Sequence, residues 1–134
     1  MHFSSRSNRI AYSLAAALLF ANCRESAPPL ETWSVRGAVV DQNGDSPTDG
    51  VVRLLTNADS RLITVGPIQP DGSFTVRTQR QGFEYPGAAP GEYSIVVITS
   101  KPGGDGNPVP VRFEVPEPFT VAKTENQLNL EIHR

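Results

Sequence analysis

From residue 33 onward, short β-rich runs alternate with clusters of turn-forming residues, and no window shows helical periodicity. The sequence therefore predicts seven strands, over residues 33–40, 51–56, 62–65, 73–78, 90–99, 109–115 and 127–133. Short strands at such regular spacing are typical of two packed sheets, because each sheet must bury one apolar face. We expect an all-β sandwich.

The side-chain alternation predicts which positions form the core. The expected inward residues are Trp33, Val35, Val39, Phe74, Val76, Leu128, Leu130 and Ile132. Residues 90–99 carry apolar side chains on both faces, which predicts a strand in the middle of a sheet. Residues 109–115 are rich in proline, which predicts an edge strand, and the Gly/Pro-rich segment 101–108 before them is expected to be a loop.

The N-terminal region has the pattern of an export signal. Arg6 and Arg9 precede an unbroken apolar run from Ile10 to Ala21, which is too short to span a bilayer comfortably. The run ends at Asn22-Cys23, and Cys23 is the single cysteine of the chain. We predict that residues 1–22 are a signal peptide and that the protein is exported.

Leu19 to Cys23 resembles a bacterial lipobox, in which the thiol accepts a diacylglycerol before the peptidase cuts ahead of it. Phe20 and Asn22 depart from the usual residues of that motif. The alternative is an ordinary signal peptide cut after Ala21 or after Cys23, which would leave no lipid. A lone cysteine at the end of the apolar run favours the lipobox, so we predict lipidation at Cys23.

Removal of residues 1–22 would leave 112 residues with 10 basic and 14 acidic side chains, and hence a charge of −4. Residues 23–32 contain a Pro-Pro pair and no periodicity, so we expect a flexible tether ahead of a single domain at 33–134. Mild acidity argues against nucleic acid as a partner. A single cysteine excludes an intramolecular disulfide, so packing must stabilise the domain.

Several short motifs resemble the transthyretin-like, or carboxypeptidase regulatory-like, β-sandwich of small bacterial exported lipoproteins. They are V-x-G-x-V at 35–39, D-x-N-G at 41–44, P-D-G-S-F-T-V at 70–76 and P-G-E-Y-S-I-V-V at 90–97, followed by the alternating strand at 128–132. The resemblance implies a seven-stranded antiparallel Greek-key sandwich. These motifs are structural, so they carry little information about function.

The turn residues of these motifs have physical roles. We expect Gly72 to take a left-handed conformation and Asp71 to bond to the nearby backbone. Gly91 is expected to set the bend into the following strand, where Tyr93 supplies a buried ring whose hydroxyl can reach the surface.

The acidic turn after the first strand could suggest calcium. Asp41, Asn43, Asp45 and Asp49 provide oxygen atoms, but Ser46 and Val52 stand where an EF-hand needs glycine and a bidentate glutamate. We therefore predict an ordinary solvated turn, no metal and no cofactor.

The sequence does not favour an enzyme. After export, His133 would be the only histidine, so neither a catalytic triad nor a histidine-based zinc site is expected. The transthyretin-related hydroxyisourate hydrolase uses several histidines and ends Tyr-Arg-Gly-Ser, whereas this chain ends Glu-Ile-His-Arg. Gly103 to Gly106 lacks the lysine and helix of a phosphate-binding loop.

Aromatic and acidic residues gather at 83–93. Glu84 and Glu92 could suggest a glycosidase, but a sandwich of this size seldom offers the cleft that such an enzyme needs. The possible ligand contacts are Phe83, Glu84, Tyr85 and Tyr93.

Two functional hypotheses follow. The first is a non-enzymatic, membrane-anchored module of the cell envelope with a structural or protein-interaction role, in which 109–118 could accept a partner strand. The alternative is a secreted or periplasmic module that binds a carbohydrate or small ligand. The expected partners are the membrane, through the lipid, and an envelope protein or glycan.

Overall fold

A computed structural model of the chain describes residues 27–134, which form nine β-strands and no helix. The strands are β1 Val35–Asp41, β2 Val51–Leu55, β3 Leu62–Pro67, β4 Ser73–Thr75, β5 Arg77–Arg80, β6 Phe83–Pro86, β7 Gly91–Pro102, β8 Pro108–Val121 and β9 Asn126–Ile132. The predicted signal peptide and Cys23 lie outside the described residues.

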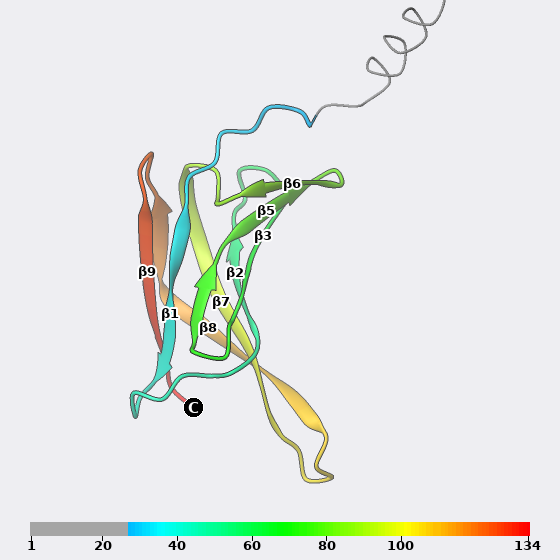
Figure 1. The fold of residues 1–134 in the computed structure, drawn as a ribbon, viewed down its shortest axis with the longest axis vertical. Helices are drawn as coiled ribbons and strands as arrows, with labels where there is room; N and C mark the ends of the chain where they lie inside the picture. The colour runs from blue at the N-terminus through cyan, green and yellow to red at the C-terminus, as the bar shows by residue number, and fades with distance from the viewer. Residues whose placement is uncertain (1–26) are drawn as a thin grey trace, which may run out of the picture.

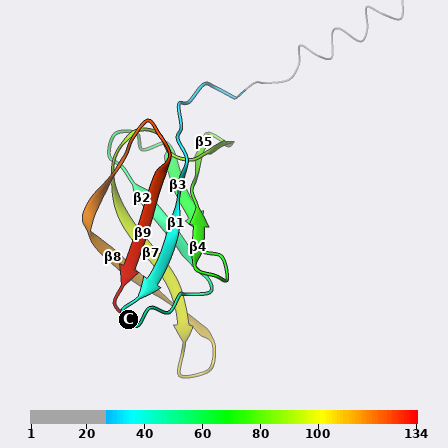
Figure 2. The ribbon, with the colours of Figure 1, turned by 60° about the vertical axis from the view of Figure 1, so that its left-hand side comes forward.

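The strands form two layers (Figure 1). A three-stranded sheet has the order β4-β1-β9, and a six-stranded sheet has the order β6-β5-β3-β2-β7-β8. Figure 2 shows β9, β1 and β4 side by side in front of β2, β3 and β7. The all-β, two-sheet architecture expected from the sequence is confirmed.

The number of strands differs from the expected seven for two reasons. The predicted strand 73–78 is interrupted at Val76, whose N–H donates to Val35 O in the small sheet while its carbonyl accepts from Gly87 N (both 2.9 Å). The chain thus crosses between sheets, and its two parts become β4 and β5. The second reason is β6, a strand of four residues in a segment where the sequence predicted none.

Strand direction is also different from the expectation. β1 pairs with β4 antiparallel but with β9 parallel, in a register that places Gly37 beside Leu128. The prediction of an entirely antiparallel sandwich is therefore wrong for this pair, because alternation shows which residues face inward but not which way a strand runs. A Cβ atom at position 37 would lie 1.6 Å from the carbonyl oxygen of Leu128, so the pairing requires glycine there.

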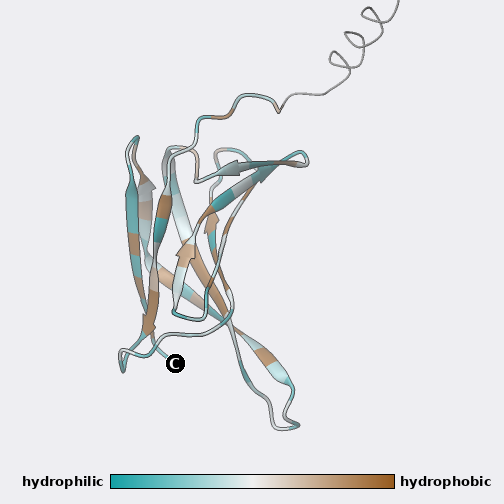
Figure 3. Ribbon diagram, viewed as in Figure 1, coloured by the Kyte–Doolittle hydropathy of each residue, from teal (hydrophilic) through white to brown (hydrophobic). Residues whose placement is uncertain are grey.

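The core lies between the two sheets, and apolar stretches along β1, β2 and β7 are visible in Figure 3. The expected core positions in β1, β4 and β9 are all buried; they are Val35, Val39, Phe74, Leu128, Leu130 and Ile132. Val76, between β4 and β5, is also buried, whereas Trp33 is only partly buried and packs against the core. In β7, adjacent residues Val96 and Val97 are both buried, as expected for an internal strand.

β7 and β8 form a long hairpin whose tip extends beyond the rest of the sandwich (Figure 1). The strands continue to Pro102 and resume at Pro108, so the connection is shorter than the loop expected at 101–108. β8 is at one edge of the large sheet, as its prolines predicted. Within residues 27–134, no helix is long and apolar enough to cross a membrane.

Phe74 provides a direct test of the core assignment. Its side chain is 2 % exposed, and a Cβ added at Gly66 of β3 would lie 3.0 Å from its ring, so the ring fills space between the two sheets. We expect Phe74→Ala to lower the free energy of unfolding by about 3–5 kcal/mol, measured by urea denaturation. Ile63→Ala, at a side chain of the large sheet that is 52 % exposed, is the control and is expected to change it little. Equal effects of the two substitutions would contradict the assignment.

Candidate functional site

The candidate ligand residues lie on two strands of the large sheet. β6 contributes Phe83, Glu84 and Tyr85, and β7 contributes Tyr93. In the β5–β6 register, Tyr85 lies opposite Thr78 and Phe83 lies opposite Arg80. Alternation therefore places Phe83 and Tyr85 on one face of the sheet with Arg80, and Glu84 on the other.

Tyr85 is almost fully buried and its polar atom is used within the chain. Its side chain is 9 % exposed, and its hydroxyl donates a 2.5 Å hydrogen bond to Pro28 O. The guanidinium carbon of Arg80 lies 5.7 Å from the centre of the Tyr85 ring, within the range of a cation–π contact. Arg80 Nη2 also donates to Pro29 O at 3.1 Å, so both residues contact the segment that precedes the domain.

Glu84 faces away from these groups. Its carboxylate is 3.1 Å from Arg77 Nη1, in an exposed ion pair of the kind that contributes little to stability. Together with Val65, Thr75 and Gln79, the pair lines an open depression of about 500 Å³.

Tyr93 belongs to the core. Its side chain is 2 % exposed and its hydroxyl donates to Ala89 O at 2.7 Å, so the hydroxyl is satisfied inside the domain. Burial raises the pKa of the phenol, because the charged phenolate is poorly solvated there. Tyr93 and Glu92 line a second depression of about 500 Å³ with Leu30, Leu55 and Leu62.

The candidate residues are divided between depressions: Glu84 and Tyr85 line a small one of about 220 Å³ with Arg77 and Pro86, whereas Tyr93 lines the one beside Leu30. Tyr93 and Glu92 lie at one depression, whereas Glu84 lies at another on the outer face of the sheet. Glu84 and Glu92, the carboxylates considered for glycoside hydrolysis, are likewise at separate depressions. Ligand contact by Phe83, Glu84, Tyr85 and Tyr93 stays a prediction.

The turn residues of the sequence motifs have the following geometry. Gly72 has a φ of +84°, and Asp71 Oδ1 accepts the N–H and the hydroxyl of Ser73 at 3.0 and 2.6 Å. These hydrogen bonds lower the pKa of the Asp71 carboxyl. Gly91 has a φ of +141° at the start of β7. The backbone at Gly72 and Gly91 is thus in a region that side chains rarely adopt.

The acidic turn after β1 bonds to its own backbone and to the C-terminus. Asp41, 8 % exposed, accepts the N–H groups of Asn43 and Asp45 at 2.8 and 3.0 Å through Oδ1. Its other oxygen is 3.4 Å from Arg134, whose backbone exchanges two hydrogen bonds with the Gln42 amide. Across residues 27–134, no three His, Cys, Asp or Glu side chains are grouped closely enough to hold a metal ion.

Two further residues singled out in the sequence are His133 and Cys23. His133, the one histidine that would remain after export, is exposed and lies 3.6 Å from Glu131. Cys23, the predicted lipidation site, is outside the part of the chain that the structure describes.

Sequence reasoning missed the contacts of Arg80 and Tyr85 with Pro28 and Pro29. These contacts join residues 51 and 57 positions apart, and no local pattern signals them. Two local features pointed toward them. Tyr85 is a large aromatic residue in a segment of alternating polarity, and the Pro28–Pro29 pair has carbonyl groups but no N–H groups.

The buried phenol of Tyr93 predicts a pH effect. The pKa of Tyr93 in the folded state is raised above the unfolded value of about 10, so the unfolded phenol ionises first. The contribution of this group to the free energy of unfolding is therefore complete below about pH 10 and is lost as pH rises through the folded-state pKa. Tyr93→Phe lacks this ionisation and also lacks the bond to Ala89, worth about 1 kcal/mol. We expect the wild type to be more stable than Tyr93→Phe at neutral pH and the difference to narrow above about pH 10. Urea denaturation across this range would measure it, and a constant difference would contradict the assignment.

Comparisons with known proteins give little to add to this geometry. No family model and no curated protein matches the chain. Among solved structures, the chain is similar to a 9R-lipoxygenase from Cyanothece PCC8801, with 11 % identity and a TM-score of 0.35. The match covers 90 % of this chain but 20 % of the lipoxygenase chain.

Proposed function

We propose that this protein is an exported, lipid-anchored β-sandwich module of the cell envelope, without enzymatic activity and with a structural or protein-interaction role. Cys23 carries the lipid, and the domain that follows is displayed from the membrane. The proposal rests first on the sequence, in which the single cysteine ends the apolar run of an export signal.

The structural observation that supports it most is that the polar groups of the candidate site are engaged within the chain. The hydroxyls of Tyr85 and Tyr93 each donate to a backbone carbonyl, and Glu84 pairs with Arg77. A catalytic or ligand site needs polar groups directed at the ligand, in a shared cavity. Polar groups that are bonded within the chain and spread over different depressions favour a module that acts through its surface.

We also propose that the domain is transthyretin-like, with the Greek-key connectivity that the resemblance implies. The motifs fall on corresponding elements: V-x-G-x-V on β1, the Pro70–Gly72 turn ahead of β4, and the Tyr93 segment in β7. The two-sheet packing around Phe74 and Tyr93 is consistent with this assignment.

The alternative, a secreted module that binds a carbohydrate or small ligand, draws on the two open depressions of the large sheet. Its test is binding to a glycan array by wild type and Tyr85→Ala. Binding that disappears in the variant would support the alternative, and an array without signal would contradict it.

The anchor is tested by the mass of the N-terminal peptide of the native protein after export. We expect a peptide that begins at Cys23 and carries a diacylglycerol, with the protein in the membrane fraction. Cys23→Ser is the control and should lose both the lipid and the membrane association. A lipid-free N-terminus at Asn22 or Arg24 would contradict the anchor and would favour the secreted alternative.

A further inference from the structure

The segment just ahead of the domain, expected from its sequence to be a flexible tether, contacts the domain at several points. Trp33 and Ala88 exchange two backbone hydrogen bonds of 2.9 Å. Glu31 accepts a bond from the Trp33 indole at 3.1 Å and lies 3.7 Å from Lys123. Leu30 lines the depression beside Tyr93. Residues 28–32, here called the linker, thus run along one end of the sandwich.

The contact furthest from the domain start is made by Arg80 and Tyr85. They come from neighbouring strands, β5 and β6, on the same face of the sheet. Tyr85 donates to Pro28 O and Arg80 donates to Pro29 O, so two consecutive carbonyls are bound by two adjacent donors. The cation–π contact at 5.7 Å holds the two donors together.

The chemistry of the donors matches the chemistry of the segment. A proline has no N–H group and restricts its backbone to an extended form, so a Pro-Pro pair presents carbonyl acceptors at little entropic cost. Arginine is a donor only, and the Tyr85 hydroxyl is used as one. Two donors facing two acceptor-only residues form a specific site for this backbone.

We infer that Arg80 and Tyr85 form an intramolecular binding site for an extended Pro-Pro backbone, and that its ligand, Pro28–Pro29, clamps the linker to the domain. The inference deepens the proposed function, because in an anchored protein the clamp determines how far the domain stands from the membrane. With the linker free, ten residue-to-residue steps join Cys23 to Trp33 and span at most about 35 Å. With Pro28 bound, five such steps join Cys23 to the bound residue and span at most about 17 Å.

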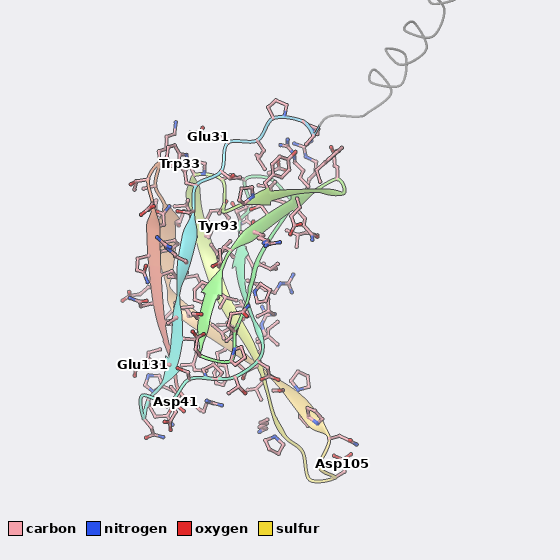
Figure 4. The ribbon with its side chains drawn as sticks, viewed as in Figure 1. Glu31, Trp33, Asp41, Tyr93, Asp105 and Glu131 are labelled. Carbon is pink, nitrogen blue, oxygen red and sulfur yellow. The ribbon has the colours of Figure 1, made fainter. Side chains whose placement is uncertain are left out.

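The clamp lies at the end of the sandwich where the chain enters the domain. Figure 4 shows Glu31, Trp33 and Tyr93 toward one end of the molecule, whereas Asp41 and Glu131 lie at the other, and Asp105 marks the hairpin tip. A short, bound linker keeps the first end toward the membrane. The β7–β8 hairpin tip and the C-terminus then face away from it.

The clamp can be tested in the full chain without any lipid, by limited proteolysis. A nonspecific protease cuts only the released linker, so the rate of cleavage between residues 27 and 32 reports the open population. We expect Tyr85→Phe, which removes only the hydroxyl, to raise this rate about fivefold, corresponding to about 1 kcal/mol for one hydrogen bond. Arg80→Gln should act in the same direction.

Arg77→Gln is the matched control for Arg80→Gln, because Arg77 is an exposed arginine of the same strand whose partner is Glu84 rather than the linker. Its linker cleavage rate should equal that of the wild type. If Tyr85→Phe and Arg80→Gln are also cleaved at the wild-type rate, Arg80 and Tyr85 do not hold the linker on the domain, and the inference is wrong.

A second measurement tests the consequence at a membrane. The lipidated protein is placed in phosphatidylcholine vesicles that carry a dansyl headgroup, and energy transfer is measured from Trp33, the only tryptophan. We expect less transfer in Tyr85→Phe than in the wild type and in Arg77→Gln. Protein that does not sediment with vesicles would contradict the anchor, not the clamp, which the proteolysis decides. If the variants sediment with the vesicles and show the same energy transfer as the wild type, the clamp does not determine the distance between the domain and the membrane.

Discussion

The parallel pairing of β1 with β9 is the constraint on which the rest of the domain depends. β1 lies in the middle of the small sheet, and Gly37 lets its backbone approach Leu128 where any Cβ would collide with the carbonyl. The residues that flank β1 extend the same dependence: Trp33 bonds to Ala88 ahead of the strand, and Asp41 pairs with Arg134 at its end. The first strand therefore connects the linker, the small sheet and the C-terminus.

This arrangement has a cost in folding, because β1 and β9 are about as distant in the domain sequence as two strands can be. Their ladder pairs residues such as Val35 with Asn126, so the small sheet is incomplete until the chain end is present. Pairings of such high sequence separation form slowly, since loop closure precedes the stabilising contacts. The Asn126 side chain reinforces the closure by donating to Ser34 O, Ala122 O and Thr124 O.

The parts of the fold that could be predicted are those with a local physical signal. Leu128, Leu130 and Ile132 alternate with polar residues, and their burial follows directly. The prolines of β8 marked an edge for an equally local reason. By contrast, the crossing at Val76 depends on Val35 in the small sheet and on Gly87 just after β6, and neither partner is visible in the segment itself. The candidate site shows the same limit, because strand alternation separates Glu84 from its sequence neighbour Tyr85, and the partner of Tyr85 is Pro28, 57 residues away. Residue type indicates only that the hydroxyl of a buried tyrosine needs an acceptor, and it does not indicate which one.

The composition of β8 bears on how the domain can meet a partner. Pro108 and Pro110 are two residues apart, so the N–H groups they lack belong to the same side of the strand. A proline inside a sheet typically stands where its missing N–H would face away from the neighbouring strand, so the free edge of the large sheet is short of donors there. Pro116 and Pro118 remove two more N–H groups from the strand. Strand addition at 109–118 would lack these bonds, which is how natural sheets discourage edge-to-edge association. A partner that approaches this edge must instead use side chains, of which Val109, 41 % exposed near the hairpin tip, is the most accessible large apolar one along β8.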